Sequence, residues 1–381
     1  MAEINPQFLF INSYDIENLI QLKNGKLLLY NVKGNNNINI YHEKTFQQIL
    51  NFDLREFLKK EKKENEKKLE DLMDREKNEF DYFDFSQSFY FSFYNIYQKT
   101  IKELNNGVIL IGADENLIEL KLNSNSTKII SCKIVKIFKR RNFIFNINEL
   151  SNQNILIITG NNIIILNKEK EQYIVKERYQ IKENWKLTFN REYYEDFSQY
   201  YSSYLLPNNK LLFHSFSHKV EIFGGCGTHD PAEHTNSKII FINLENFEEI
   251  KSTDTFSIYA KIIIFEKIII IQEMNFVFIY DINTLDIINK IKFDGYYNHL
   301  YKYNDKYIIK QSFYKEKNLF IVYRIENNNL IKDHIININP RFLERNRWSD
   351  NEFTGYNKFI YFLKDKKFII IFRYIMYVFE I

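Results

Sequence analysis

The sequence contains few of the residues that usually form turns and cross-links. Its 381 residues include 10 glycines, 4 prolines and 2 cysteines. The cysteines, Cys132 and Cys226, are far apart and match no metal-binding or redox spacing, so we expect a reduced, intracellular compartment, the cytoplasm. Because glycine and proline are scarce, turns must depend on asparagine, aspartate and lysine. Pairs such as Asn24-Gly25 and Asn106-Gly107 stand where hairpin turns are needed.

Export and membrane signals are missing from the sequence. The N-terminus lacks a basic segment followed by an apolar run, so we predict no secretory signal. Residues 260–280 and 368–381 are rich in isoleucine and phenylalanine, but both carry charged residues, and a membrane span needs about 20 apolar residues with few charges. We interpret both segments as buried strands.

Linear catalytic motifs are missing as well. The sequence has no P-loop, no dinucleotide-binding glycine motif, and no HExxH or GxSxG motif. This favours a binding protein over an enzyme and predicts no cofactor. The net charge of +3 is too small to require a nucleic-acid partner.

What the sequence does contain is a repeat. An apolar run, a turn rich in asparagine and lysine, and further apolar runs recur every 40–50 residues or so, with four predicted strands in each set. The phrases "IQLKNGKLLLY" and "IKELNNGVILIG" show the similarity. The predicted sets cover residues 17–53, 96–134, 144–181, 199–256, 258–294, 298–337 and 358–381, and the last set has only three strands.

This pattern resembles the WD40-like β-propeller superfamily. The resemblance covers nearly the whole chain but lies in pattern rather than in signature residues: Tyr280-Asp281 approximates the Trp-Asp pair, and Gly224-Gly225 is kelch-like. It implies an all-β, closed β-propeller of about seven four-stranded blades, formed as a single domain over residues 1–381; a six-blade count stays open. We expect the N-terminal strand, Gln7–Tyr14, to pair with the incomplete last set, which removes two exposed sheet edges.

The long departures from the repeat predict a functional face. In a WD40-like propeller, connections from the last strand of one blade to the next blade, and from second to third strands, open on the same face. The insertions at residues 54–95, 182–198, 217–237 and 338–357 all belong to these two classes. Loops on a rigid scaffold often carry binding groups, so we predict that this rim is functional. The first insertion should begin as a charged, solvated helix, or alternatively a partner-binding one, from Arg55 to about Glu79.

Arginine and tryptophan residues on this rim are the predicted partner-binding residues. Both residue types are common interface anchors, and arginine suits carboxylate or phosphate groups. The predicted set is Arg140, Arg141, Trp185, Arg345, Arg347 and Trp348.

One segment, "HSFSHKVEIFGGCGTHDPAEH", gathers histidines, glycines and a cysteine. Cys226, His229 and His234 could bind zinc, although their spacing matches no standard zinc motif. We favour the interpretation that this is a glycine-hinged loop with ordinary polar side chains.

The leading hypothesis is a non-enzymatic interaction scaffold, a monomer or a complex subunit, that binds a protein or peptide partner. The arginine clusters make an acidic partner a natural choice. A second hypothesis is a propeller enzyme, a hydrolase or lyase, assisted by a metal at the histidine-rich segment. A third is an RNA- or DNA-binding propeller that uses the basic clusters.

Overall fold

The structure is a computed structural model, which describes most of the repeat. The described residues are 3–4, 8–11, 18–30, 37–64, 68, 100–113, 115–138, 143–170, 172–182, 197–219, 236–255, 261–273, 275–293, 298–314, 317–338, 358–362, 367–372 and 375–380. Within them, the strands form seven sheets, six of four strands and one of five. The chain divides into two compact units: residues 1–14, 206–208 and 255–381 form the first, and residues 15–205 and 209–254 form the second.

The second unit contains four sheets, and the strands of each sheet follow one another in sequence order. The first sheet is β3 (Asn18–Gln21), β4 (Leu27–Tyr30), β5 (Asn37–Tyr41) and β6 (Gln48–Asp53). The second is β7 (Ile101–Glu103), β8 (Ile109–Ala113), β9 (Asn116–Leu122) and β10 (Ile129–Ile137). The third is β11 (Ile144–Glu149), β12 (Ile155–Thr159), β13 (Asn162–Glu169) and β14 (Gln172–Gln180). The fourth is β15 (Phe197–Leu206), β16 (Lys210–Lys219), β17 (Asn236–Asn243) and β18 (Glu248–Thr255).

Turns in these sheets depend on asparagine, as the scarcity of glycine and proline predicts. Asn24 Oδ1 accepts a hydrogen bond from the backbone N–H of Lys26 at 3.2 Å, and Asn106 and Asn152 accept equivalent bonds two residues further on. This local bond stabilises a turn without proline. Gly25 and Gly107 adopt positive φ angles of 89° and 80° in the first two of these turns.

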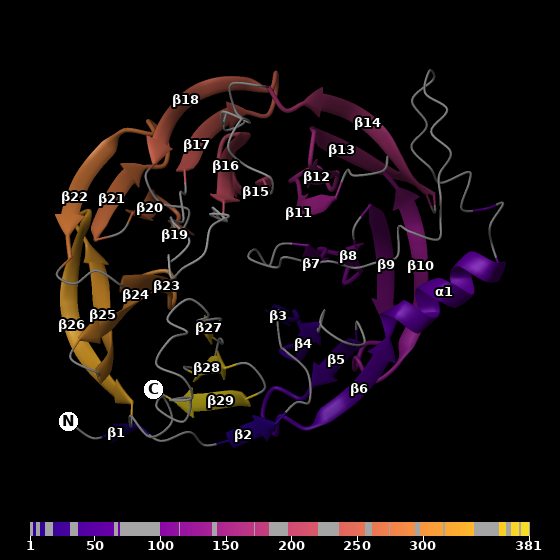
Figure 1. Ribbon diagram of the computed structural model, residues 1–381, viewed down its shortest axis with the longest axis horizontal. Helices are drawn as coiled ribbons and strands as arrows, with labels where there is room; N and C mark the ends of the chain where they lie inside the picture. Colours follow the sequence, from indigo (N-terminus) through magenta and orange to yellow (C-terminus); the bar gives the residue numbers. More distant parts are fainter. Residues whose placement is uncertain are drawn as a thin grey trace, which may run out of the picture. The chain divides into compact units, whose positions relative to one another are not determined.

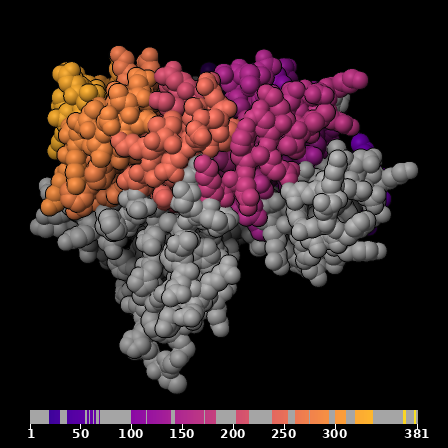
Figure 2. All heavy atoms as spheres, turned by 90° about the horizontal axis from the view of Figure 1, so that it is seen from above, coloured from indigo at the N-terminus to yellow at the C-terminus, as the bar shows by residue number. Residues whose placement is uncertain are grey.

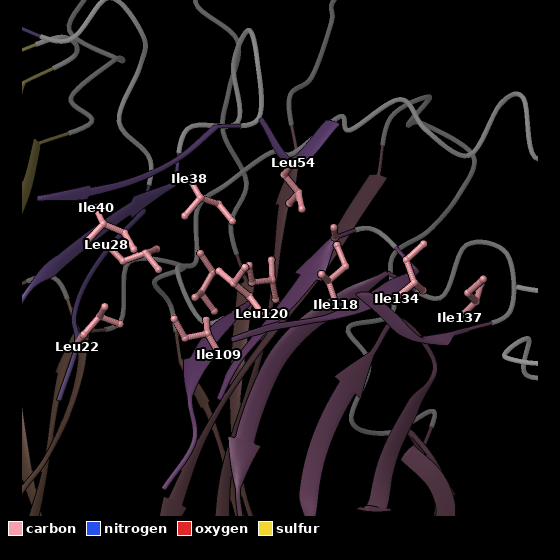
Figure 3. Close-up of a cluster of buried hydrophobic side chains, with 13 residues drawn as sticks. Leu22, Leu28, Ile38, Ile40, Leu54, Ile109, Ile118, Leu120, Ile134 and Ile137 are labelled. Atoms are coloured by element: carbon pink, nitrogen blue, oxygen red, sulfur yellow. The ribbon is translucent and has the colours of Figure 1, made fainter. Parts of the chain in front are cut away.

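Neighbouring sheets in the second unit pack face to face through apolar side chains. Between the first and second sheets, Leu28 and Ile40 belong to the same apolar cluster as Ile118 and Leu120 of β9 (Figure 3). The next two interfaces repeat this arrangement, so the middle strands are buried on both faces. Figure 1 shows the four sheets in a row, and Figure 2 shows the purple and magenta atoms of the second and third sheets directly against one another.

The first unit contains three sheets. One is β19 (Lys261–Ile264), β20 (Ile268–Glu273), β21 (Phe276–Asp281) and β22 (Ile287–Lys292). Another is β23 (Asn298–Lys302), β24 (Tyr307–Tyr314), β25 (Lys317–Glu326) and β26 (Asn329–Ile338), with β1 (Glu3–Ile4) as a fifth strand. The last is β27 (Lys358–Phe362), β28 (Lys367–Phe372) and β29 (Ile375–Glu380), joined by β2 (Phe8–Ile11).

The N-terminal strand pairs with the last set, which confirms that prediction. Strand β2 runs antiparallel to β29, with Phe8 opposite Val378 and Ile11 opposite Ile375. Strand β1 was not predicted; it pairs with β26 in parallel through Glu3 and Ile4 alone. Two residues are too few to produce a strand pattern in the sequence.

A single helix, α1 (Leu54–Glu64), is found among the described elements, and it follows β6 directly. Asp53 Oδ1 accepts a hydrogen bond from the N–H of Glu56 at 2.8 Å, which caps the first turn. Leu54 is buried between the first two sheets, and Phe57 packs 5.7 Å from Phe52 between ring centroids. The sequence predicts that this helix continues to about Glu79. Beyond Glu64, Lys68 is the one residue of that predicted stretch that the structure describes. Nowhere in the described ranges is a helix long and apolar enough to cross a membrane.

Candidate functional site

The longest connections of the chain all lie at one end of the sheets. Because successive strands run in opposite directions, the connections between first and second and between third and fourth strands lie at one end, which we call the turn end. We call the other the insertion end. In the second unit, the turn-end connections are short, such as residues 104–108 and 170–171. The insertion-end connections include residues 54–100, 181–196 and 220–235, and in the first unit residues 339–357.

The residues predicted to bind a partner belong to connections at the insertion end, and all of them lie outside the described residues. They are Arg140, Arg141, Trp185, Arg345, Arg347 and Trp348. The residues of the alternative zinc site, Cys226, His229 and His234, also lie outside the described residues. Their roles therefore stay predictions.

Within the ranges given above, no group of three or more His, Cys, Asp or Glu residues is placed to hold a metal ion. Cys132 on β10 is partly buried against the apolar interface of the first two sheets. Burial, with a smaller contribution from the negative charge of Glu61, raises the pKa of the Cys132 thiol to about 12. A thiol with that pKa is a poor nucleophile at neutral pH.

The turn end is held together by hydrogen bonds from sheet to sheet. Glu103, the last residue of β7, accepts the backbone N–H of Lys23 from the preceding sheet at 2.7 Å. Glu149, the last residue of β11, accepts the N–H of Asn105 in the same way, also at 2.7 Å. Lys23 Nζ donates to the carbonyl oxygen of Leu104 at 2.8 Å. Hydrogen bonds therefore link the first three sheets of the second unit at this end.

A buried glutamate on β9 interrupts the apolar repeat. In five of the sheets, a backbone hydrogen bond closes the turn between the first and second strands. Counting two residues on from the carbonyl of that bond gives the same position on the second strand of each sheet, and this position pairs with one residue of the third strand. In the second sheet these two residues are Leu110 and Glu119. At the same position, four other described sheets carry buried apolar residues, Ile40, Ile165, Ile279 and Val322.

Four side chains from two sheets surround the Glu119 carboxylate. On Oε2, Lys168 Nζ and the Tyr173 hydroxyl donate hydrogen bonds of 2.5 and 2.9 Å, and both residues come from the third sheet. On the other oxygen, Oε1, the ammonium groups of Lys121 and Lys133 lie at 3.4 and 3.7 Å. We call this group the Glu119 cluster. The glutamate side chain is fully buried, whereas the three lysine side chains are 25–34% exposed.

Electrostatic interactions keep Glu119 ionised in the interface between the second and third sheets, which we call a seam. Burial alone would raise the pKa of its carboxyl group. Hydrogen bonds from Lys168 and Tyr173, together with the charges of Lys168 and Lys121, outweigh burial and lower that pKa below its usual range. The carboxylate is therefore negatively charged at neutral pH. It forms ion pairs with the ammonium groups of Lys121, Lys133 and Lys168.

A second polar seam lies between the third and fourth sheets. The Asn148 side-chain amide donates to Asn146 Oδ1 and to the Ser203 hydroxyl, each at 2.9 Å. Asn146 in turn donates to the Ser203 carbonyl oxygen at 3.3 Å. All three residues belong to first strands, β11 and β15. These neutral groups satisfy one another, which is typical of a structural contact.

The sequence analysis missed the Glu119 cluster, although a signal was present. Strand β9 reads "NLIELKL", with Glu119 and Lys121 on one face of a strand expected to be buried on both sides. The corresponding strand β5 reads "NINIY" and carries no charge. Comparing repeats position by position would have shown the exception. Lys133, Lys168 and Tyr173 could not have been found in this way, because the sequence does not show which strands come together.

Comparisons with known proteins address the fold. No protein-family model matches the chain, and no curated protein matches it. The β-propeller domain of Cps50 (Swd1) from Myceliophteria thermophila is similar over 99% of each chain, with 8% identity and a TM-score of 0.53. BamB from Moraxella catarrhalis is similar over 99% of this chain and 100% of its own, with 9% identity and a TM-score of 0.48, too low to support an inference. The chain thus resembles β-propeller proteins in fold, and at this identity the likeness extends to fold alone.

Proposed function

We propose that the chain is a closed, seven-bladed β-propeller that acts as an interaction scaffold for a protein or peptide partner. The seven sheets of the described residues supply the blades, and β2 completes the last of them. The observation that carries the proposal is the contrast between the two sheet ends. The turn end is tied by hydrogen bonds such as that between Glu103 and Lys23, and the insertion end receives the long connections. Long connections on a rigid base are a common arrangement for binding.

The proposed contact residues are Arg140, Arg141, Trp185, Arg345, Arg347 and Trp348. Tryptophan supplies a large apolar surface, and the arginine guanidinium binds carboxylates through paired hydrogen bonds. An acidic protein or peptide therefore suits this surface best. The intracellular location inferred from cysteine usage belongs to the same proposal.

A pull-down with a double variant tests this function. In the variant Arg347→Ala with Trp348→Ala, we expect recovery of a bound partner to fall about tenfold or more, since the loss of one interface anchor costs about 2 kcal/mol. The matched control is Lys44→Ala, which changes an exposed turn-end residue and should leave recovery unchanged. Both proteins should unfold at the wild-type temperature. Undiminished recovery with the double variant would show that the partner binds elsewhere.

A further inference from the structure

The Glu119 cluster holds more positive charge than its carboxylate can neutralise. Lys121 and Lys168 both contact this one carboxylate, so these two ammonium groups carry one positive charge more than the carboxylate neutralises. Lysines that share a single acidic group repel one another, and this repulsion is stronger in a half-buried seam than in open water.

The two oxygens of the Glu119 carboxylate differ in their contacts. Lys168 and Tyr173 satisfy Oε2 by hydrogen bonding. Oε1 accepts no hydrogen bond, although it is fully buried, and the ammonium groups of Lys121 and Lys133 lie at ion-pair distances of 3.4 and 3.7 Å from it. Lys121 therefore donates no hydrogen bond to Glu119 Oε1, and about a third of its side chain is exposed to solvent.

The position of the cluster shows that it is not part of the general design of the sheets. In four other described sheets the position of Glu119 is occupied by a buried aliphatic residue, and packing there needs no charge. A buried ion pair contributes little net stability compared with well-packed hydrocarbon. A departure of this kind from a consistent repeat is expected at functional sites.

From the surplus of ammonium groups around one carboxylate in the seam between the second and third sheets, we propose that the Glu119 cluster is a binding site for a phosphate group. A phosphate monoester carries a charge of −1.5 to −2 or so at neutral pH and has three acceptor oxygens, so it can bridge several ammonium groups at once. Lysine serves as a point charge for phosphate, which needs no flat, paired geometry. In this arrangement Glu119 does not contact the phosphate, and its negative charge offsets part of the positive charge that attracts the phosphate.

The cluster lies beside the turn end, since Lys121 and Lys168 precede the connections at residues 123–128 and 170–171. The phosphate site is therefore separate from the proposed partner surface at the insertion end. Either proposal can fail without the other.

Titration calorimetry of the full chain with inorganic phosphate tests the site. We expect saturable binding, and a weakening of about tenfold or more in each of Lys121→Gln and Lys133→Gln, since each removes a charged hydrogen-bond donor. Lys176→Gln is the matched control, because Lys176 forms a one-to-one ion pair with Glu177 at 3.3 Å in the third sheet. The proposal would be refuted if the wild-type protein showed no saturable binding, or if both lysine variants bound phosphate as tightly as the wild type.

Glu119→Gln provides a readout that a purely structural role would not give. Removing the negative charge increases the positive surplus, so phosphate should bind this variant more tightly than the wild type. Weaker binding by a folded Glu119→Gln protein would contradict the proposed arrangement. If the variant does not fold, the two lysine variants decide the question.

Two further ligands identify the source of the phosphate. A phosphoserine peptide that binds more tightly than inorganic phosphate would indicate a phosphorylated protein partner. The same peptide with glutamate in place of phosphoserine should bind more weakly, because it carries less charge and fewer acceptors. Inorganic phosphate that binds at least as well as the phosphopeptide would indicate a phosphorylated small molecule.

Discussion

Strand β9 faces two neighbours with opposite chemistry. Toward the first sheet it presents Ile118 and Leu120, which pack in an apolar cluster (Figure 3). Toward the third sheet it presents Leu117 at one end and then Glu119 and Lys121, where the Glu119 cluster replaces hydrocarbon. The same backbone and the same alternation of side chains support both faces. Packing between sheets therefore tolerates a charged seam, provided that the facing sheet supplies partners such as Lys168.

Truncating the apolar face should have the largest effect on stability. Leu120→Ala removes a fully buried side chain from the first interface and should lower the free energy of unfolding by about 2–5 kcal/mol, the sum of lost burial and the cavity left behind. Urea denaturation measures the change. Ile130→Ala, at a position 66% exposed on β10, should cost less than about 0.5 kcal/mol. Similar losses in the two variants would show that the interface is not closely packed.

Neutralising the charged face should have a smaller effect. Glu119→Gln keeps the shape of the side chain but replaces the ionic acceptor of Lys168 and Tyr173, and the free energy of unfolding should fall by about 1–3 kcal/mol. The lysines are partly exposed and can recover hydration, which limits the loss. The same urea titration checks it. A loss as large as that of Leu120→Ala would mean that the seam depends on the ion pair as much as on hydrocarbon.

Acid should remove the difference between wild type and Glu119→Gln. The pKa of Glu119 is lowered in the folded protein, whereas in the unfolded chain it is about 4.3. The stabilisation by this carboxylate is therefore fully present above the unfolded pKa and is lost as pH falls through the folded value. The unfolding free energies of the two proteins should approach each other as the pH falls below the unfolded value of about 4.3. A difference that stays constant from pH 7 to pH 3 would contradict the lowered pKa.

Much of the fold could be predicted because its signals are local. Strand sets followed from apolar runs separated by turns such as Asn24-Gly25, and the structure shows strands in each predicted set. The pairing of β2 with β29 followed from one surplus strand and one incomplete set. The parallel addition of β1 to β26 could not be predicted, since Glu3 and Ile4 form no pattern and their pairing depends on where the edge of β26 happens to lie.

The sequence by itself determined the strands, their grouping in fours and the asparagine-based turns, because alternation of side chains and turn chemistry act within a few residues. Tertiary structure alone decided that Glu119 and Lys121 meet Lys168 and Tyr173 from a different sheet. The charge of such a cluster is a sum over residues about 50 positions apart, and only the face-to-face packing of two sheets brings those residues within the few ångströms over which ion pairs and hydrogen bonds are strong.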